Sequence, residues 1–314
     1  MEADARAQQS HLPGAPAPHP TFARERPRPG ARVLLRACRP RQWAKNALVL
    51  AAPCSAGVIF RPLVAAQVAG AFAVLCLVSS ATYLLNDVRD REQDREHPRK
   101  RERPIASGEI SPAFALLFAS ALALIGVALG ALITPGLGVL ACVYLALTAC
   151  YSLWLRHVFV ADMLVIAAGF VLRALAGGIA TDIYLSRWFV IVTGSCAVYL
   201  VAAKRYAELG ARTGAPSSRA TLRRYSRGGL RLVLLAAASV AAAGYIGWAF
   251  TRPSHLVWYI GSIAPFLLWL ARYATLIGAG AGEAPEDLIL RDRALLLLSS
   301  AWGVLFLGGV YVGG

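Results

Sequence analysis

Charged side chains are scarce in this chain of 314 residues, in which Asp, Glu, Lys and Arg together make up only 16%. An average soluble domain carries roughly a quarter of such residues. Hydrophobic residues account for 57% of the chain, and the mean hydropathy is +0.55. This balance excludes an ordinary soluble enzyme and a largely disordered chain, and it indicates a protein that crosses a membrane several times.

Cysteine pairs and signal-peptide features are also missing. None of the six cysteines forms a CxxC pair and most lie in apolar segments, so we interpret them as small buried residues rather than a zinc site or disulfides. No Ser–His–Asp arrangement is visible. Residues 1–31 are rich in Pro, Ala and Arg and contain no apolar core, which predicts a disordered cytoplasmic tail and not a signal peptide.

Long apolar runs predict a single membrane domain over residues 32–314, with no room for a second folded domain. Each spanning helix needs about 20 mostly apolar residues. We expect nine spans, of which the first and sixth are short. Their approximate bounds are 46–60, 64–85, 112–133, 136–154, 159–180, 188–203, 231–250, 256–271 and 294–312.

Positive charge is distributed unevenly between the loops. With a cytoplasmic N-terminus and nine spans, all but four of the 32 Lys and Arg residues lie in the N-terminal tail or in cytoplasmic loops. The exceptions are Arg61, Arg187 and Arg252 outside, and Arg173 within the membrane. This bias fits the positive-inside rule. Because the basic loops are short and tethered at a membrane, the positive charge does not indicate nucleic-acid binding.

Acidic residues gather in the loop 86–111, where the second predicted span meets the cytoplasm. Asn86, Asp90 and Asp94 are spaced by four, and Asp87 precedes Asp90 by three. If the helix continues, all four line one face. Oxygen ligands of this kind suit Mg²⁺, which keeps waters and bridges substrate phosphates. The alternative is a solvated helix end whose acids are neutralised by flanking Arg and Lys residues.

The pattern NDxxDxxxD over residues 86–94 is followed by His97-Pro98, Lys100, Arg103-Pro104 and Gly108. It closely resembles the first motif of the UbiA superfamily of intramembrane transferases. The resemblance implies an all-α bundle of nine transmembrane helices with cytoplasmic active-site loops at 86–111 and 204–231. It also implies catalytic, Mg²⁺-binding roles for Asn86, Asp87, Asp90 and Asp94.

The superfamily normally carries a second acidic motif of the DxxxD type between spans six and seven. Here the matching stretch reads Ala-Lys-Arg-Tyr-Ala-Glu, with Lys204 and Glu208 where two acids are expected. One acid has become a base. This departure disfavours an isoprenyl diphosphate as donor and adds positive charge where a phosphate can bind.

Three further stretches, 39–46, 151–157 and 169–178, resemble one branch of the superfamily, the decaprenyl-phosphate phosphoribosyltransferases. The resemblance implies transfer of 5-phosphoribose from phosphoribosyl pyrophosphate (PRPP) to decaprenyl or another polyprenyl phosphate, with release of pyrophosphate. The product feeds lipid-linked arabinose donors for cell-wall arabinan. The implied substrate-binding residues are Arg41, Lys45, Lys100, Arg103, Tyr151, Arg156, Arg173, Lys204, Arg205, Glu208, Arg223 and Arg224.

Both implied substrates are anions, so surplus positive charge is useful in the site. We expect the donor's 5-phosphate to bind basic residues of the loop 204–231, and the acceptor's phosphate to bind cations near the membrane surface. Arg173 faces the bundle interior or a cavity, because a charge inside the membrane is costly. A structural pairing of Arg173 with Asp162 is the alternative.

The expected protein is a Mg²⁺-dependent pentosyltransferase in a bacterial plasma membrane, with its N-terminus and active site cytoplasmic. Its partners are PRPP, a polyprenyl phosphate and the lipid bilayer, and the sequence allows a homo-oligomer. Two alternatives stay open: a UbiA-type aromatic prenyltransferase that uses a polyprenyl diphosphate, and an anion transporter. The first needs an intact second acidic motif, and the second has no evident need for the acidic cluster.

Overall fold

The computed structural model describes residues 29–155, 158, 161–210, 224–252, 255–280 and 285–312. Within these ranges all regular secondary structure is helical and no strand occurs, which confirms the all-α class. The first helix is α1 (Ala31–Ala37). The predicted disordered tail, residues 1–31, lies almost entirely outside the described residues and stays a prediction.

Eight of the described helices are long and apolar enough to cross a membrane. The chain is therefore a multi-span membrane protein, as its composition predicted. These helices are α3 (Pro62–Arg89), α5 (Pro112–Ile133), α6 (Pro135–Leu153), α7 (Ala161–Ala180), α8 (Arg187–Gly210), α9 (Arg227–Phe250), α10 (Leu256–Gly278) and α12 (Arg293–Tyr311).

The predicted span 46–60 is not one continuous α-helix. The chain forms the 3₁₀ helix η1 (Pro40–Leu50) and then the short α-helix α2 (Ala51–Ser55). The helix ends there because Gly57 adopts a positive φ of 72°, which turns the chain. A 3₁₀ helix rises about 2.0 Å per residue, so η1 and α2 together extend roughly 30 Å, close to a hydrocarbon core. The count of nine spans stays a prediction.

Proline and capping residues set several helix boundaries. Pro62, Pro112 and Pro135 stand in the first turns of α3, α5 and α6, where the missing N–H costs nothing. Thr134 adopts an extended backbone between α5 and α6 and accepts a hydrogen bond of 3.2 Å from the backbone N–H of Leu137. A tight turn at Thr134 therefore joins α5 to α6, and the two helices pack as an antiparallel pair.

Large apolar side chains cover the outside of the bundle. On α5, Leu117 and Leu132 are 69% and 84% exposed, and on α12 Leu297 is 71% exposed. A soluble protein rarely presents an apolar surface of this extent. The outward-facing surface therefore matches a lipid environment.

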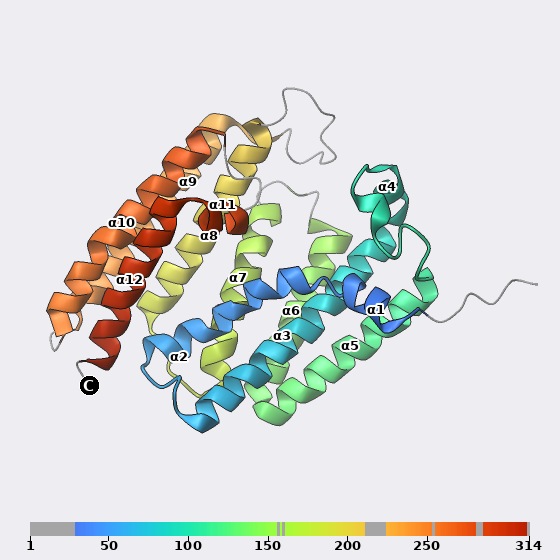
Figure 1. Ribbon diagram of the computed structural model, residues 1–314, viewed down its shortest axis with the longest axis horizontal. Helices are drawn as coiled ribbons and strands as arrows, with labels where there is room; N and C mark the ends of the chain where they lie inside the picture. The colour runs from blue at the N-terminus through green and yellow to red at the C-terminus, as the bar shows by residue number, and fades with distance from the viewer. Residues whose placement is uncertain are drawn as a thin grey trace, which may run out of the picture.

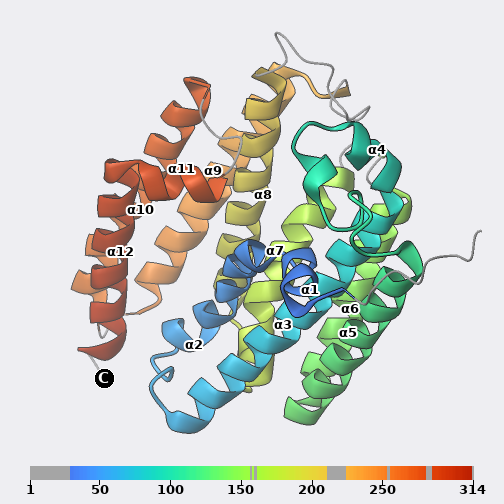
Figure 2. The same cartoon turned by 45° about the vertical axis from the view of Figure 1, so that its right-hand side comes forward.

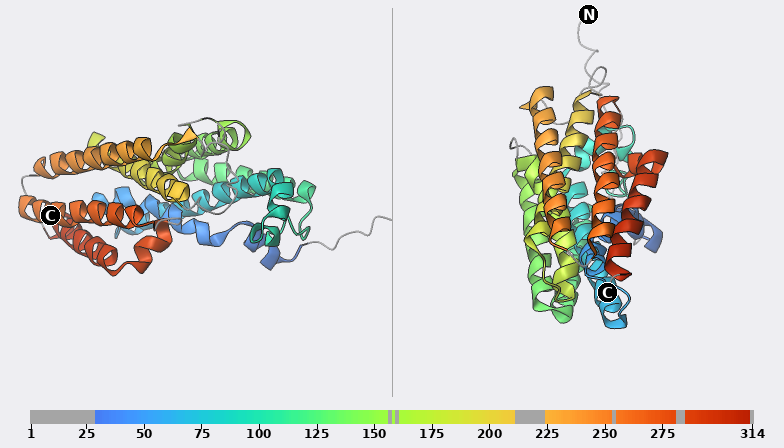
Figure 3. Two further views of the ribbon diagram at one scale, coloured as in Figure 1. Left: turned by 90° about the horizontal axis from the view of Figure 1, so that it is seen from above. Right: turned by 90° about the vertical axis from the view of Figure 1, so that its left-hand side faces the viewer.

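The helices pack in two groups, which Figures 1 and 2 show from two directions. In the first, α3 packs on α5, α6, α7 and η1; in the second, α8 packs on α9, and α10 packs on α9 and α12. The view from above in Figure 3 shows the two groups side by side. Three short helices lie outside this core: α4 (Arg91–Glu96), η2 (Lys100–Glu102) and α11 (Pro285–Arg291).

The predicted active-site loops emerge at one end of the bundle. In Figure 1, α4, the C-terminal end of α8 and the start of α9 all lie at the top. The cysteines are free thiols, as expected, but only Cys38 and Cys76 are buried, and Cys142 on α6 is exposed. The interpretation of all six cysteines as buried residues was therefore wrong in part, because Cys142 faces outward and Cys54, Cys150 and Cys196 are half-buried.

Candidate active site

The acidic motif is divided between two helices. The helix α3 ends at Arg89, and Asp90 leaves helical geometry with φ −89° and ψ 8° before α4 begins. Asn86 and Asp87 thus belong to α3, whereas Asp94 belongs to α4. The expectation that one continuous helix places all four side chains on one face was wrong, because the break at Asp90 reorients the chain.

Asp87 and Asp94 nevertheless lie next to each other. The Nη1 atom of Arg103 donates hydrogen bonds to Oδ1 of Asp87 at 3.1 Å and to Oδ2 of Asp94 at 2.5 Å. The two acidic residues are only 3% and 2% exposed. Lys100 adds a longer contact, its Nζ lying 3.9 Å from Oδ1 of Asp94. A pair of buried carboxylates and the cations Lys100 and Arg103 therefore form one cluster.

Arg39 is a member of this cluster that the sequence analysis missed. Its guanidinium forms an ion pair and a hydrogen bond with Asp87, and it also lies over the ring of Tyr83, 5.3 Å from the centroid. Arg39 has a positive φ of 54° between α1 and η1. The only sequence signal was its place as the first residue of the stretch 39–46. Its contact with Asp87 spans 48 positions and is invisible in a linear motif.

Asn86 faces a different neighbour. Its Oδ1 accepts a hydrogen bond from the hydroxyl of Ser152, a buried residue at the end of α6. One turn away, Nη2 of Arg89 donates to the backbone carbonyl of Leu153 at 3.1 Å. These contacts hold the end of α3 against the end of α6. In this arrangement Asn86 serves helix packing and does not join the two carboxylates.

The carboxylate pair suits a divalent cation whose remaining ligands come from the substrate and from water. Among the residues that the structure describes, no group of three or more His, Cys, Asp or Glu side chains is arranged to hold a metal ion. Mg²⁺ is commonly bound by one or two carboxylates together with phosphate oxygens and waters. Asp87 and Asp94 meet this smaller requirement, and Arg39 and Arg103 form ion pairs with Asp87.

The helix η1 carries the predicted substrate residues Arg41 and Lys45, followed by the buried Asn46. Arg41 is exposed, Lys45 lines a cavity described below, and Asn46 is 1% exposed. The backbone of η1 lies directly on α7: a Cβ atom at Gly177 would stand 1.8 Å from the carbonyl oxygen of Val49. Glycine at position 177 is therefore required for this close approach.

Arg173 lies inside the bundle, as its position in an apolar run predicted. Its Nε donates to Oδ1 of Asn46 at 2.9 Å, Nη1 to the Gly169 carbonyl at 2.8 Å and Nη2 to the Tyr144 hydroxyl at 2.5 Å. The guanidinium also lies 4.9 Å from the centroid of the Tyr144 ring. It does not line the large cavity. The pairing of Arg173 with Asp162 was wrong, because the structural partners of Arg173 are Asn46, Gly169 and Tyr144.

Asp162 pairs instead with the second-motif region of α8. Nη2 of Arg205 lies 2.8 Å from Oδ2 of Asp162, and Nη1 of Arg205 donates to Oε2 of Glu208 at 2.6 Å. The hydroxyl of Tyr151 on α6 donates to Oδ1 of Asp162 at 2.6 Å. Arg205 and Asp162 are 2% and 1% exposed. This cluster joins the ends of α6, α7 and α8, and Asp162 is a site residue that no local sequence motif marks.

Three predicted substrate residues remain: Arg156, Arg223 and Arg224. Arg156 and Arg223 lie outside the described residues. Arg224, just before α9, is exposed. Their roles in substrate binding stay predictions.

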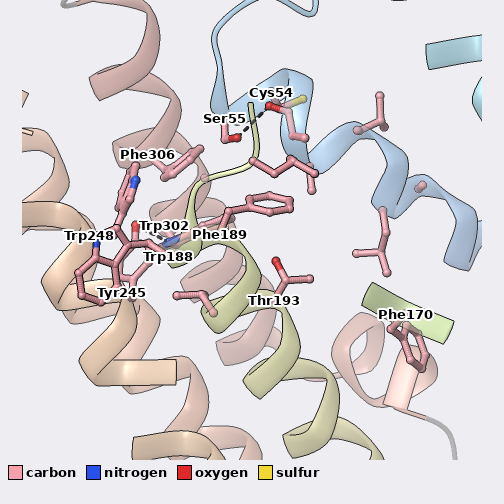
Figure 4. Close-up of a pocket in the computed structure, with 18 of the residues that line it drawn as sticks. Cys54, Ser55, Phe170, Trp188, Phe189, Thr193, Tyr245, Trp248, Trp302 and Phe306 are labelled. Carbon is pink, nitrogen blue, oxygen red and sulfur yellow. Dashed lines mark hydrogen bonds between the residues drawn. The ribbon is translucent and has the colours of Figure 1, made fainter. Parts of the chain in front are cut away.

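A cavity of about 890 Å³ lies between the two helix groups. Apolar and aromatic side chains from η1, α2, α7, α8, α9 and α12 form most of its wall, and Figure 4 shows the aromatic part. Among its described lining residues, the charged ones are all basic: Lys45, Lys204, Arg205 and Arg252. The aromatic lining residues that Figure 4 labels are Phe170, Trp188, Phe189, Tyr245, Trp248, Trp302 and Phe306.

This cavity joins a long apolar surface to a basic end. Such a shape suits an amphiphile whose hydrocarbon chain is buried and whose anionic head contacts Lys and Arg side chains. The helical membrane fold, the buried charge clusters and this cavity together suit a membrane protein that binds a lipid anion. Helices α7 and α8, which carry the Asp162–Arg205 pair, supply both apolar and basic parts of its wall.

The family profile described as the UbiA prenyltransferase family matches residues 47–311. The chain belongs to this family. It is 42% identical over 276 residues to the decaprenyl-phosphate phosphoribosyltransferase of Mycobacterium tuberculosis H37Rv, covering 86% of this chain and 91% of that protein. It is 41% identical over 299 residues to the enzyme of the same name from Corynebacterium glutamicum, covering 92% and 90%.

Solved structures show the same fold. A UbiA homolog from Archaeoglobus fulgidus bound to GPP and Mg²⁺ superimposes with a TM-score of 0.66 at 15% identity, covering 88% of this chain and 99% of that one. The same homolog bound to Cd²⁺ gives a TM-score of 0.63. At this identity the likeness establishes the fold, and the substrates must be argued from the residues and the closer relatives.

Proposed function

We propose that this protein transfers the 5-phosphoribosyl group of PRPP to decaprenyl phosphate or a related polyprenyl phosphate, releasing pyrophosphate. The observation that carries the proposal is the identity of about 40% over most of the chain to curated decaprenyl-phosphate phosphoribosyltransferases. The replacement of an acidic second motif by Lys204, Arg205 and Glu208 supports it independently. A donor held only by paired acidic motifs does not need these cations.

The acceptor lipid occupies the cavity between the helix groups. Its aromatic and apolar wall receives part of the polyprenyl chain, and Lys45 and Lys204 bind the phosphate at the basic end. Arg41 and Arg156 remain candidates for contacts with the same phosphate near the membrane surface. Arg173 is better suited to hold η1 in place, because its hydrogen bonds go to Asn46, Tyr144 and Gly169.

The donor binds at the loop 86–111. Asp87 and Asp94 would hold a Mg²⁺ ion together with the diphosphate, and Asp90 stands at the junction between them. When bound, the ion neutralises charge on the departing pyrophosphate. Arg39, Lys100 and Arg103 stabilise the phosphate oxygens, and Arg223 and Arg224 are candidates for the 5-phosphate.

The chemistry requires little acid–base help from the chain. The acceptor's phosphate oxygen is already ionised near neutral pH, so it attacks C1 of the ribose without a strong general base. The chain's own contribution is to orient the two anions and keep water from an oxocarbenium-like centre. Direct displacement inverts the configuration at C1.

We further propose that the domain spans residues 32–314 and that the N-terminus and both active-site loops are cytoplasmic in a bacterial plasma membrane. The distribution of basic residues supports this orientation. The product is a polyprenyl lipid carrying phosphoribose, which suits a route to lipid-linked arabinose donors. The relatives named decaprenyl-phosphate phosphoribosyltransferase support this product.

The test is a transfer assay in membranes that contain the protein, with labelled PRPP, decaprenyl phosphate and Mg²⁺. Label should enter the lipid phase, and chelator or Asp94→Asn should abolish the transfer. Glu92→Gln is the matched control on α4, because the Glu92 side chain is 72% exposed and lies outside the carboxylate pair. Prenylation of an aromatic acid instead would favour the aromatic prenyltransferase, and anion flux without either transfer would favour the transporter.

A further inference from the structure

Arg205 combines burial, a place on the cavity wall and two acidic partners. It is 2% exposed, lines the cavity, and contacts both Asp162 and Glu208. Its Nε has no hydrogen-bond partner among the described residues. An orphaned N–H is costly when buried, so this donor points to a polar ligand in the cavity.

The two acids sit behind the wall and offset its charge. Neither Asp162 nor Glu208 lines the cavity, whereas Lys45, Lys204 and Arg205 do. Counted by formal charge, these five described side chains together carry one positive charge. Without the two acids, the three bases would carry three positive charges. The two acids therefore reduce the positive charge of the cavity wall that these three bases form.

We infer that Asp162 and Glu208 are specificity-determining residues that make the cavity accept a lipid with a single phosphate and reject a lipid diphosphate. This inference rests on the proposed function and deepens it. A diphosphate brings more negative charge, which the weakly positive end compensates poorly and which the two carboxylates repel. Discrimination by a repulsive element is a common way to separate related ligands.

The hydrogen bond from Tyr151 fits this role for Asp162. The Tyr151 hydroxyl donates to Oδ1 of Asp162, while Oδ2 faces Arg205. Both oxygens of the carboxylate are therefore held in place by a partner. A purely structural tie between helices does not require ions, because apolar side chains of similar size often pack as well. The cluster is built from charges that act on a ligand at the cavity wall.

The experiment uses the purified full chain in detergent, with chelator present so that no metal contributes to diphosphate binding. Dissociation constants are measured by calorimetry for farnesyl phosphate and farnesyl diphosphate, and their ratio is compared between variants. The wild type should bind the monophosphate more tightly. Asp162→Asn should shift the ratio about tenfold toward the diphosphate, equivalent to about 1.4 kcal/mol.

Two further variants separate selectivity from a general loss of structure. Glu208→Gln, whose side chain is 24% exposed, should shift the ratio in the same direction if Asp162→Asn does not fold. Asp182→Asn removes one exposed carboxylate between α7 and α8 and should leave the ratio unchanged. A structural role alone would weaken both ligands equally.

The outcomes are distinct. If the wild type binds the monophosphate but neither Asp162→Asn nor Glu208→Gln changes the ratio, the specificity role is overturned and the proposed function stands. If the wild type binds neither lipid, the acceptor site itself is overturned. A shift of the ratio toward the diphosphate in the two cluster variants, with none in Asp182→Asn, supports the inference.

Discussion

The Nε atom of Arg173 donates a hydrogen bond of 2.9 Å to Oδ1 of Asn46, joining α7 to η1 across 127 positions of sequence. Asn46 in turn donates to the sulfur of Cys76 at 3.4 Å on α3. An intramembrane cation thus positions the helix that carries Lys45 into the cavity wall. This relationship explains how a 3₁₀ segment without a long α-helical span is held in the bundle.

Replacing Arg173 should destabilise the protein. Arg173→Met removes three hydrogen bonds and leaves the buried Asn46 and Tyr144 without their donor, so we expect a loss of about 2–4 kcal/mol. Thermal unfolding in detergent measures the change. Arg187→Met is the control, because Arg187 is exposed and contacts the Trp188 ring at the start of α8. Equal unfolding temperatures for the two variants would contradict the structural role.

Gly177 should not accept a larger side chain. In Gly177→Ala the new Cβ would stand 1.8 Å from the carbonyl oxygen of Val49, so η1 must move away from α7. We expect a marked loss of thermal stability together with weaker binding of the acceptor lipid. Gly228→Ala is the matched control in α9, where nothing lies within 4 Å of the added atom. Alanine there should be neutral or stabilising, by up to about 1 kcal/mol.

Asn86 and Asp87 should respond differently to substitution. Asp87→Asn removes a carboxylate from the pair, so the Mg²⁺ concentration for half-maximal transfer should rise at least tenfold. Asn86→Ala breaks the contact with Ser152 and should lower stability while leaving that concentration nearly unchanged. A magnesium titration of transfer activity measures both variants. A comparable rise in Asn86→Ala would restore Asn86 as a metal ligand.

Asp292 should contribute stability that depends on pH. Hydrogen bonds from Arg272 and from the backbone N–H of Leu295 lower the pKa of this carboxyl from its ordinary value of 3.8. A lowered pKa in the folded state adds stability above the unfolded value, and that stability is lost as pH falls through the folded value. The wild type should therefore unfold at a higher temperature than Asp292→Asn near neutral pH.

The difference between wild type and Asp292→Asn should shrink steadily when the pH is lowered below about 4. Asparagine caps a helix nearly as well as aspartate, so the substitution tests the charge and not the cap of α12. Unfolding temperatures between pH 7 and pH 3 provide the comparison. A difference that is independent of pH would show that the ion pair with Arg272 does not stabilise the folded state.

Much of the site could be placed from local patterns, and some could not. The run from Asn86 to Gly108 identified the acidic loop because its residues are close in sequence. The partners Arg39, Ser152 and Asp162 escaped because each contact spans more than 40 positions or pairs residues from different helices. The break at Asp90 was missed because no proline or glycine marks it.

The amino-acid sequence by itself determined the membrane class, the positions of eight long helices and the family. These depend on apolar run length and on a contiguous motif, both of which are local properties. The tertiary structure decided that Asp87 and Asp94 share Arg103, that Arg205 faces Asp162, and that Arg173 serves η1. Which buried charge meets which partner depends on how helices pack, because each costly charge must find its counterpart in space rather than along the chain.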